Sequence, residues 1–253
     1  MRIPLIIALF GWLNLVPLVS AQDLPRQLRI QVEWIELKQA ELGALMASHG
    51  DGDESGARSS NDGALRDSLG KMIESGEATL LETAVILARS GQRAKAESIR
   101  EMVYPTEFKA PGWEAAEDEA EESREDEAED GDEADFLAIG APIPSAFETR
   151  NVGTTVEVDP VLGADGKTID INLNPEIVYY TGDTVHETRR GEETVEVAIP
   201  AFYSMRVIMS VTVRAGEYLL LGTTSPPDAE TGEADRSRKV LVFVKADVLV
   251  VGK

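Results

Sequence analysis

The chain has 253 residues, 43% of them hydrophobic, which is enough for one moderate domain or two small ones with a real core. Its net charge of −22 at pH 7 argues against nucleic acid as a partner and against unaided binding to an anionic membrane surface, because like charges repel. The lack of cysteine excludes disulfides, a lipoprotein anchor and any thiol nucleophile or thiolate metal ligand.

Residues 1–21 have the pattern of a cleaved secretory signal. Arg2 supplies a positive charge, residues 3–19 form an apolar run, and the small residues Ser20 and Ala21 stand where a signal peptidase cuts. The alternative is a membrane anchor, but two prolines and an asparagine interrupt a run barely long enough to cross a bilayer. We therefore predict that the signal is removed and that the mature chain is exported.

The first part of the mature chain mixes strands and helices. Apolar and polar residues alternate over 28–34, which predicts a half-buried strand, and helical spacing follows at 38–48. Residues 50–63 are rich in Gly, Asp and Ser and predict an exposed loop. Apolar residues on one face predict a second helix at 64–74, which Gly76 should end.

Two β-like runs come next, at 79–89 and 92–103. The turn residues Ser90 and Gly91 stand between them. This order predicts a hairpin.

Residues 113–135 form a separate compositional unit. They include fourteen acidic residues against the single Arg124. Such a segment cannot bury enough apolar surface to offset the entropy lost on ordering, so we predict a disordered insert. A solubilising linker and a tail that binds cations or a partner are both open interpretations.

The second half is more strongly β. We expect strands over 152–158, 169–173, 205–213, 218–221 and 239–244. Gly163 and Gly166 predict a hairpin between the first two strands, and Ala215 and Gly216 predict another between the next two. The first of these turns superficially resembles a phosphate-binding loop, but a turn between two strands is the better interpretation.

Few residues suggest a chemical site. The two histidines, His49 and His186, lie far apart in polar sequence, and no serine has a Gly-x-Ser-x-Gly setting. We predict that both histidines are exposed loop residues. The chain is therefore expected to have no catalytic, cofactor-binding or metal site and not to be an enzyme.

One spacing competes with that expectation. The loop from Asp51 to Asp62 has the ligand pattern of a calcium loop, in which Asp53 and Ser55 would also bind the ion. Arg58 stands where an apolar residue is expected, and a loop rich in Asp and Gly produces such spacings by chance. A solvent loop is the preferred interpretation.

Five groups of short motifs occur along the chain in a fixed order. They are 31–37 (QVEWIEL) with 41–43 (ELG); 90–94 (SGQRA) with 104–107 (YPTE); 147–153 (FETRNVG) with 156–160 (VEVDP), 165–166 (DG) and 169–175 (IDINLNP); 206–207 (RV) with 210–213 (SVTV) and 216–222 (GEYLLLG); and 240–244 (VLVFV). Each alone is ordinary strand and turn chemistry. Together they resemble the C-terminal domain of the bacterial secretin family of type II and type III secretion and type IV pilus systems.

The resemblance implies a mainly β fold with a few helices (α+β), built from long antiparallel hairpins and interrupted by the acidic insert. It divides the chain into a signal peptide (1–21), an N-terminal part (22–112), the disordered insert (113–141) and a β-hairpin part (142–253). The hairpins expected over 147–173 and 205–221 would carry assembly.

Secretins are rings whose C-terminal domains form a double-walled β-barrel through the outer membrane. The resemblance thus implies a homo-oligomeric channel for protein secretion or pilus passage, in the outer membrane of a Gram-negative cell or its periplasm. Other envelope components of the secretion or pilus system would be its partners, and no cofactor is implied.

Two features depart from the family pattern. Only the predicted signal precedes the strand at 28, so we expect the docking domains of the family to be absent, and polar residues 223–228 replace an expected apolar segment. The alternative is therefore a soluble periplasmic accessory protein with this fold and no pore of its own. Four apolar residues discriminate the two, since they face either lipid or a core: Val207, Met209, Val211 and Val213.

Overall fold

A computed structural model describes residues 25–49, 61–109, 142–190 and 193–251. Over these residues the fold is mainly β, with nine strands and two helices. In chain order they are β1 (Arg26–Lys38), α1 (Gln39–His49), α2 (Gly63–Ser75), β2 (Ala78–Ala88), β3 (Ala94–Lys109), β4 (Ile143–Leu162), β5 (Thr168–Arg190), β6 (Glu193–Arg206), β7 (Met209–Arg214), β8 (Tyr218–Thr224) and β9 (Arg238–Val250).

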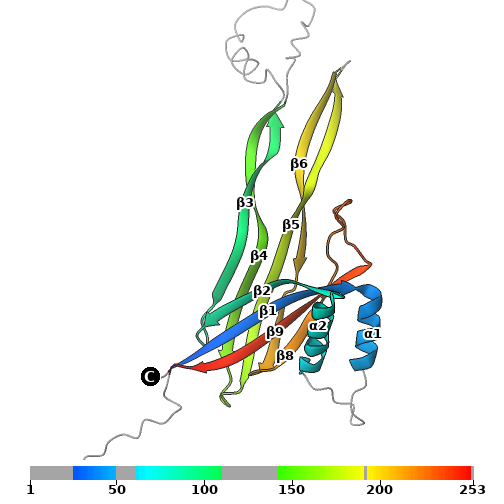
Figure 1. The fold of residues 1–253 in the computed structure, drawn as a ribbon. Helices are drawn as coiled ribbons and strands as arrows, with labels where there is room; N and C mark the ends of the chain where they lie inside the picture. Colours follow the sequence, from blue (N-terminus) through cyan, green and yellow to red (C-terminus); the bar gives the residue numbers. More distant parts are fainter. Residues whose placement is uncertain (1–24, 50–60, 110–141, 191–192, 252–253) are drawn as a thin grey trace, which may run out of the picture.

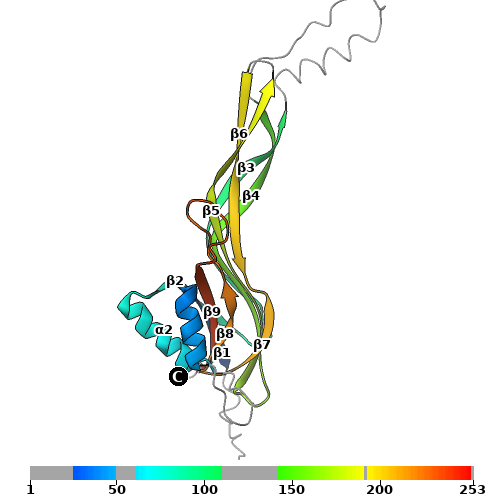
Figure 2. The same cartoon turned by 90° about the vertical axis from the view of Figure 1, so that its right-hand side faces the viewer.

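The strands form two antiparallel sheets. Sheet A has the order β2-β1-β9-β8 and sheet B the order β3-β4-β5-β6, with β7 pairing the lower part of β5. The two helices cover one face of sheet A, and sheet B packs on the other (Figure 2). These three layers are called the base below.

The base has a separate apolar core on each side of sheet A. Leu28, Ile30 and Val32 of β1 point toward sheet B and are fully buried there, as the alternation over 28–34 predicts. On the opposite side of β1, the polar residues near its start give way to Ile35 and Leu37, which are buried against the helices. The sequence of β1 therefore changes on one face at the point where the helices begin to cover it.

Both predicted helices are confirmed. Gly76 ends α2 with a φ of 80°, and its N–H donates to the carbonyl of Ile73. Glycine adopts this left-handed conformation without the steric cost that a Cβ brings. The helix and its stop were both readable from the sequence.

Two long hairpins rise from the base (Figure 1). The pairing of β4 with β5 ends at Gly153 and Val178, but β3 and β4 continue to pair beyond this row, and so do β5 and β6. We call the β3–β4 hairpin above Gly153 the first arm, and the β5–β6 hairpin above Val178 the second arm. Both arms extend well beyond the strand lengths that the sequence predicted.

Two of the predicted hairpins are wrong. β2 and β3 are joined by the expected turn, but β2 pairs with β1 and β3 with β4. The Gly91 N–H donates to the carbonyl of Pro160 at 2.8 Å, so this turn is tied to sheet B as the chain leaves sheet A. A glycine turn thus marks a change of sheet here.

The hairpin expected over 205–221 is wrong for the same reason. The run divides into the end of β6, the separate strand β7 on sheet B, and β8 on sheet A. Ala215 N–H donates to Lys167 O and Gly216 N–H to Ala246 O, which bonds the connecting turn to both sheets. The predicted hairpin around Gly163 and the last strand are confirmed.

Candidate functional site: the free edges of sheet B

The residues singled out for chemistry lie apart in the structure. His49 is exposed at the end of α1, and His186 is exposed in β5. Both histidines are thus exposed as predicted, but neither lies in a loop. Within the described residues, no group of three or more His, Asp or Glu side chains is placed to hold a metal ion. No helix in the same part of the chain is long and apolar enough to cross a bilayer.

Asp62 has a structural role at the edge of sheet A. Its carboxylate Oδ2 accepts a hydrogen bond from the Leu220 N–H at 2.7 Å, and its own N–H donates to the Tyr218 carbonyl at 2.7 Å. Asp62 therefore satisfies two polar groups of β8 that would otherwise be open to another strand. The other proposed calcium ligands, at 51–55, lie outside the described residues.

The loop that resembles a phosphate site is a hairpin turn. The Asp165 carboxylate accepts hydrogen bonds from the backbone N–H groups of Lys167 and Thr168, both at 2.9 Å. These bonds, with one from the Thr168 hydroxyl, lower the pKa of Asp165 to about 2. The backbone donors that would bind a phosphate are thus already occupied.

Sheet B, in contrast, ends on each side in a strand whose outer edge is unpaired. β3, with 16 residues, forms one edge, and β6, with 14 residues, forms the upper part of the other. Neither edge is paired or capped by another strand of the described chain. Long uncovered edges present rows of free N–H and C=O groups and are templates for pairing with a further strand.

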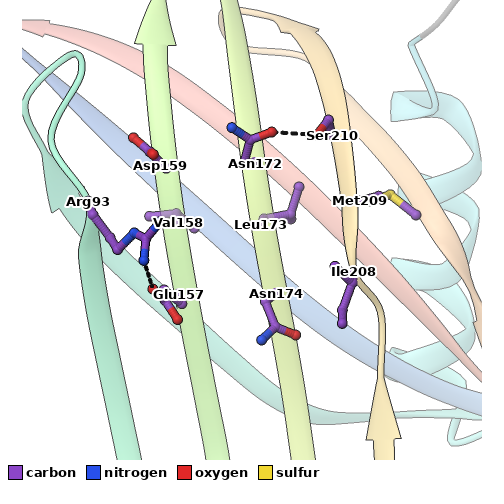
Figure 3. A pocket seen from close by; sticks show the side chains of 10 residues that line it. All are labelled: Arg93, Glu157, Val158, Asp159, Asn172, Leu173, Asn174, Ile208, Met209 and Ser210. Atoms are coloured by element: carbon purple, nitrogen blue, oxygen red, sulfur yellow. Dashed lines mark hydrogen bonds and ion pairs between the residues drawn. The ribbon is translucent and has the colours of Figure 1, made fainter.

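The side of sheet B that faces away from sheet A is mostly polar in the base, where Val161 and Ile208 are its exposed apolar residues. Figure 3 shows Glu157 and Asp159 of β4 beside Asn172 and Asn174 of β5, around a hollow of about 390 Å³. The Ser210 hydroxyl of β7 donates to Asn172. Such a surface suits contact with water and not with hydrocarbon.

Four residues were expected to distinguish a channel from an accessory protein, and they point toward sheet A. Val213 is buried, and Val207, Met209 and Val211 pack against the core between the two sheets. In this structure they fill a core.

Large apolar side chains are exposed on the arms as well as on the base. Val103 on β3 is 67% exposed and Phe147 on β4 is 59% exposed, and Ile143 and Val185 are also exposed near the arm ends. Exposed apolar side chains that gather into a patch mark contact with a partner or a membrane, and these four residues are spread over both arms. Sequence reasoning missed β6 and the upper part of β5, although Val195 and Val197 alternate there with Thr194 and Glu196.

Comparison with known proteins gives a likeness in fold. No family model matches the chain, and no curated protein does. Among solved structures, Aeromonas hydrophila ExeD is 12% identical, with a TM-score of 0.39, over 90% of this chain and 49% of that one. The type II secretin GspD of enteropathogenic Escherichia coli is 12% identical, with a TM-score of 0.42, over 90% and 70%. The secretin domain of InvG from the Salmonella SPI-1 injectisome is 13% identical, with a TM-score of 0.38, over 91% and 64%.

The chain is therefore similar to secretins, as the five groups of motifs predicted, over most of its own length. It spans about half the length of ExeD.

Proposed function

We propose that this protein is the subunit of a ring-shaped channel in the outer membrane of a Gram-negative cell, through which proteins or a pilus pass. The observation that carries the proposal is the pair of long free edges on sheet B. β3 and β6 run in opposite directions, because three successive antiparallel pairings separate them: β3 with β4, β4 with β5, and β5 with β6. β3 of one copy can therefore pair with β6 of the next in antiparallel fashion and continue the sheet.

The capped edge of sheet A supports the choice of sheet B. A head-to-tail ring requires two open edges on the same sheet, and Asp62 occupies part of the β8 edge of sheet A. Pairing between copies is thus directed to β3 and β6.

The dimensions and the polarity of the arms fit a membrane wall. Above Ser204, the register partner of Val178, β6 has 11 residues, which is as many as the roughly 9–11 that a tilted strand needs to cross the bilayer hydrocarbon. The exposed apolar residues Val103 and Phe147 lie on the arms, while the outer face of the base is mostly polar. In the proposed ring the arms cross the membrane and the base lies in the periplasm.

The function is proposed to be assembly and not catalysis. No catalytic step is assigned to any side chain, and the partners would be further copies and other envelope components of a secretion or pilus system. Export through a signal at residues 1–21 belongs to the same proposal.

A second candidate is a periplasmic accessory protein that makes no pore. The core-filling positions of Val207, Met209 and Val211 favour it, because this face does not meet lipid. Such a protein would use the same edges to bind a larger secretin.

The test is the oligomeric state of the protein extracted from envelopes in detergent. We expect a large, heat-resistant ring on gels of unboiled samples and in electron micrographs. Val197→Lys with Ile199→Lys places charges along the β6 edge and should abolish the ring. Val85→Lys is the matched control, because Val85 lies on the edge strand β2 of sheet A and is 53% exposed.

A monomer in both detergent and plain buffer would contradict the channel. A ring that tolerates the two lysines would contradict the role of β6. Recovery of the chain only in complex with a larger secretin would favour the accessory protein.

A further inference from the structure

The two arms touch each other within one chain, in a way that a continuous barrel wall does not allow. Pairing between β4 and β5 stops at Gly153 and Val178, so each arm above this row is a two-stranded ribbon. Isolated ribbons twist more strongly than strands inside a sheet. Which side of each ribbon faces the other arm can be followed from the register.

In the first arm, one side continues the core-facing side of sheet B. Val156 of β4 is fully buried in the core. The register of β3 with β4 is unbroken from Ala94 to Tyr104, which pairs with Glu148. Because side chains alternate along a strand, Tyr104 and Arg150 belong to the same side as Val156.

In the second arm, the sides are fixed in the same way. Tyr179 and Tyr203 are register partners that pack against the core between the sheets. Their chain neighbours Tyr180, Phe202 and Ser204 therefore belong to the opposite, outer side of sheet B.

These two unlike sides are in contact. The rings of Tyr104 and Phe202 lie 5.4 Å apart between centroids. Within the second arm, Tyr180 meets its register partner Phe202 edge-on at 6.3 Å and supports that ring. The Arg150 guanidinium donates to the Ser204 hydroxyl at 3.0 Å. In one continuous wall, Tyr104 and Phe202 would point to opposite sides, so this contact and a four-stranded wall exclude each other.

The contact is held at both ends. Gly153 has a φ of 127°, and a Cβ there would lie 2.2 Å from the Ser98 carbonyl oxygen, so the branch point requires glycine. The Tyr104 hydroxyl donates to Glu148 at 3.2 Å and the Tyr180 hydroxyl to Asp183 at 2.8 Å. These bonds fix the direction of both rings.

We propose that the contact between Tyr104, Arg150, Tyr180, Phe202 and Ser204, which we call the aromatic clasp, keeps an isolated subunit closed and must open before β3 and β6 pair with neighbouring copies. The proposal rests on the proposed ring assembly. In the free subunit, each arm then contacts the other arm of the same chain. The clasp thus holds β4 and β5 apart above Gly153 and Val178, so a continuous wall of arms cannot form until it opens.

Cross-linking tests the clasp directly, because the chain has no cysteine of its own. Tyr104→Cys with Phe202→Cys is joined in the monomer by a short bis-methanethiosulfonate, which forms a disulfide with each cysteine, releases methanesulfinate and is cleaved again by reduction. We expect efficient linking within one chain, no ring after transfer to detergent or lipid, and recovery of the ring on reduction. The control is Val103→Cys with Thr149→Cys, which are register partners on β3 and β4 and stay neighbours in either state.

A second variant keeps the test independent of the reagent. Phe202→Ala removes the central ring of the clasp without touching a base residue. The oligomeric ring should form about two- to tenfold faster than that of the unsubstituted protein, the range expected from losing the aromatic pair of Tyr104 and Phe202, which joins the arms.

Three results would overturn the clasp: no link between positions 104 and 202 in the monomer, a ring formed equally well by the linked protein, or an unchanged rate for Phe202→Ala. If the unsubstituted protein makes no ring under any condition, the proposed function fails. The linking yield in the monomer then still decides whether the arms are clasped.

Discussion

The base and the arms use the same alternating strand pattern with opposite results. In the base, sheet A is covered on both faces, and Trp34 and Phe243 are almost completely removed from water. In the arms, each hairpin is two strands wide, and Val103 and Phe147 remain exposed. Alternation therefore makes a strand, but a strand is stabilised only where a second layer exists. Within the chain, the arms contact each other through Tyr104 and Phe202, which supplies part of that second layer.

The largest expected effect is a difference between base and arms in how much a substitution lowers the free energy of unfolding. Trp34→Ala leaves a cavity between the sheets and should lower the free energy of unfolding by about 3–5 kcal/mol. Val103→Ala on the first arm should change it by less than about 0.5 kcal/mol. Denaturant unfolding of the monomer measures both. Equal losses would show that the arms carry as much of the fold as the base.

A second substitution probes how the helices are fixed to the base. Glu33 of β1 is only 3% exposed, and the Arg66 guanidinium of α2 is bonded to its carboxylate. Arg66→Ala leaves that carboxylate buried without its cation and should cost about 3 kcal/mol. The double variant Glu33→Gln with Arg66→Met should be far closer to the unsubstituted protein in the same denaturation experiment. A double variant as unstable as the single one would contradict this role for the ion pair.

A third, smaller effect concerns the edge that distinguishes sheet A from sheet B. Asp62→Ala leaves the Leu220 N–H without its acceptor and should cost about 1–2 kcal/mol. Hydrogen exchange at Leu220 should become faster, whereas Asp62→Asn, which keeps an acceptor oxygen, should preserve its protection. Unchanged exchange in the alanine variant would mean that the β8 edge is open.

The smallest effect is a pH dependence where the base meets the second arm. The loop between β8 and β9 starts at Ser225, whose carbonyl accepts from the Tyr203 hydroxyl, and ends beside Arg238. Hydrogen bonds from the Ser237 hydroxyl and Arg238 lower the pKa of Asp235 to about 2.

A carboxyl with a lowered folded pKa stabilises the native state above its unfolded pKa, and that stability is lost as pH falls from about 4 through about 2. Asp235→Asn should therefore be less stable than the unsubstituted protein at pH 6, and the gap should narrow toward pH 2. Thermal unfolding at several pH values measures this. A constant gap would show that ionisation of Asp235 does not contribute.

The sequence predicts individual elements better than their partners. The alternation at Leu28 to Trp34, the Gly76 stop and the turn at Gly163 each depend on a few neighbouring residues, and all three are confirmed. Gly91 and Gly216 give the same turn signal as Gly163, yet at both positions the chain crosses between sheets. Whether a chain folds back or crosses over is decided by long-range packing, which a local pattern does not contain.

The candidate site shows the same limit. The motifs on β4 and β5 lead to the correct sheet, but the free edges are defined only by what fails to pair with them. The clasp was beyond sequence reasoning, because Tyr104 and Phe202 lie on opposite sides of the sheet and meet only through the twist of the arms.

The unlike edges of sheet B also determine what kind of assembly is possible. A contact between β3 and β6 has a direction, so each copy that joins offers the same vacant edge again, and no pair of copies is complete by itself. In the proposed ring, the copy number would be fixed by the angle between successive subunits and not by the strength of any one contact. Gly153 lies where the arms leave the base, so in that ring its backbone conformation would set the direction of the arms relative to the base.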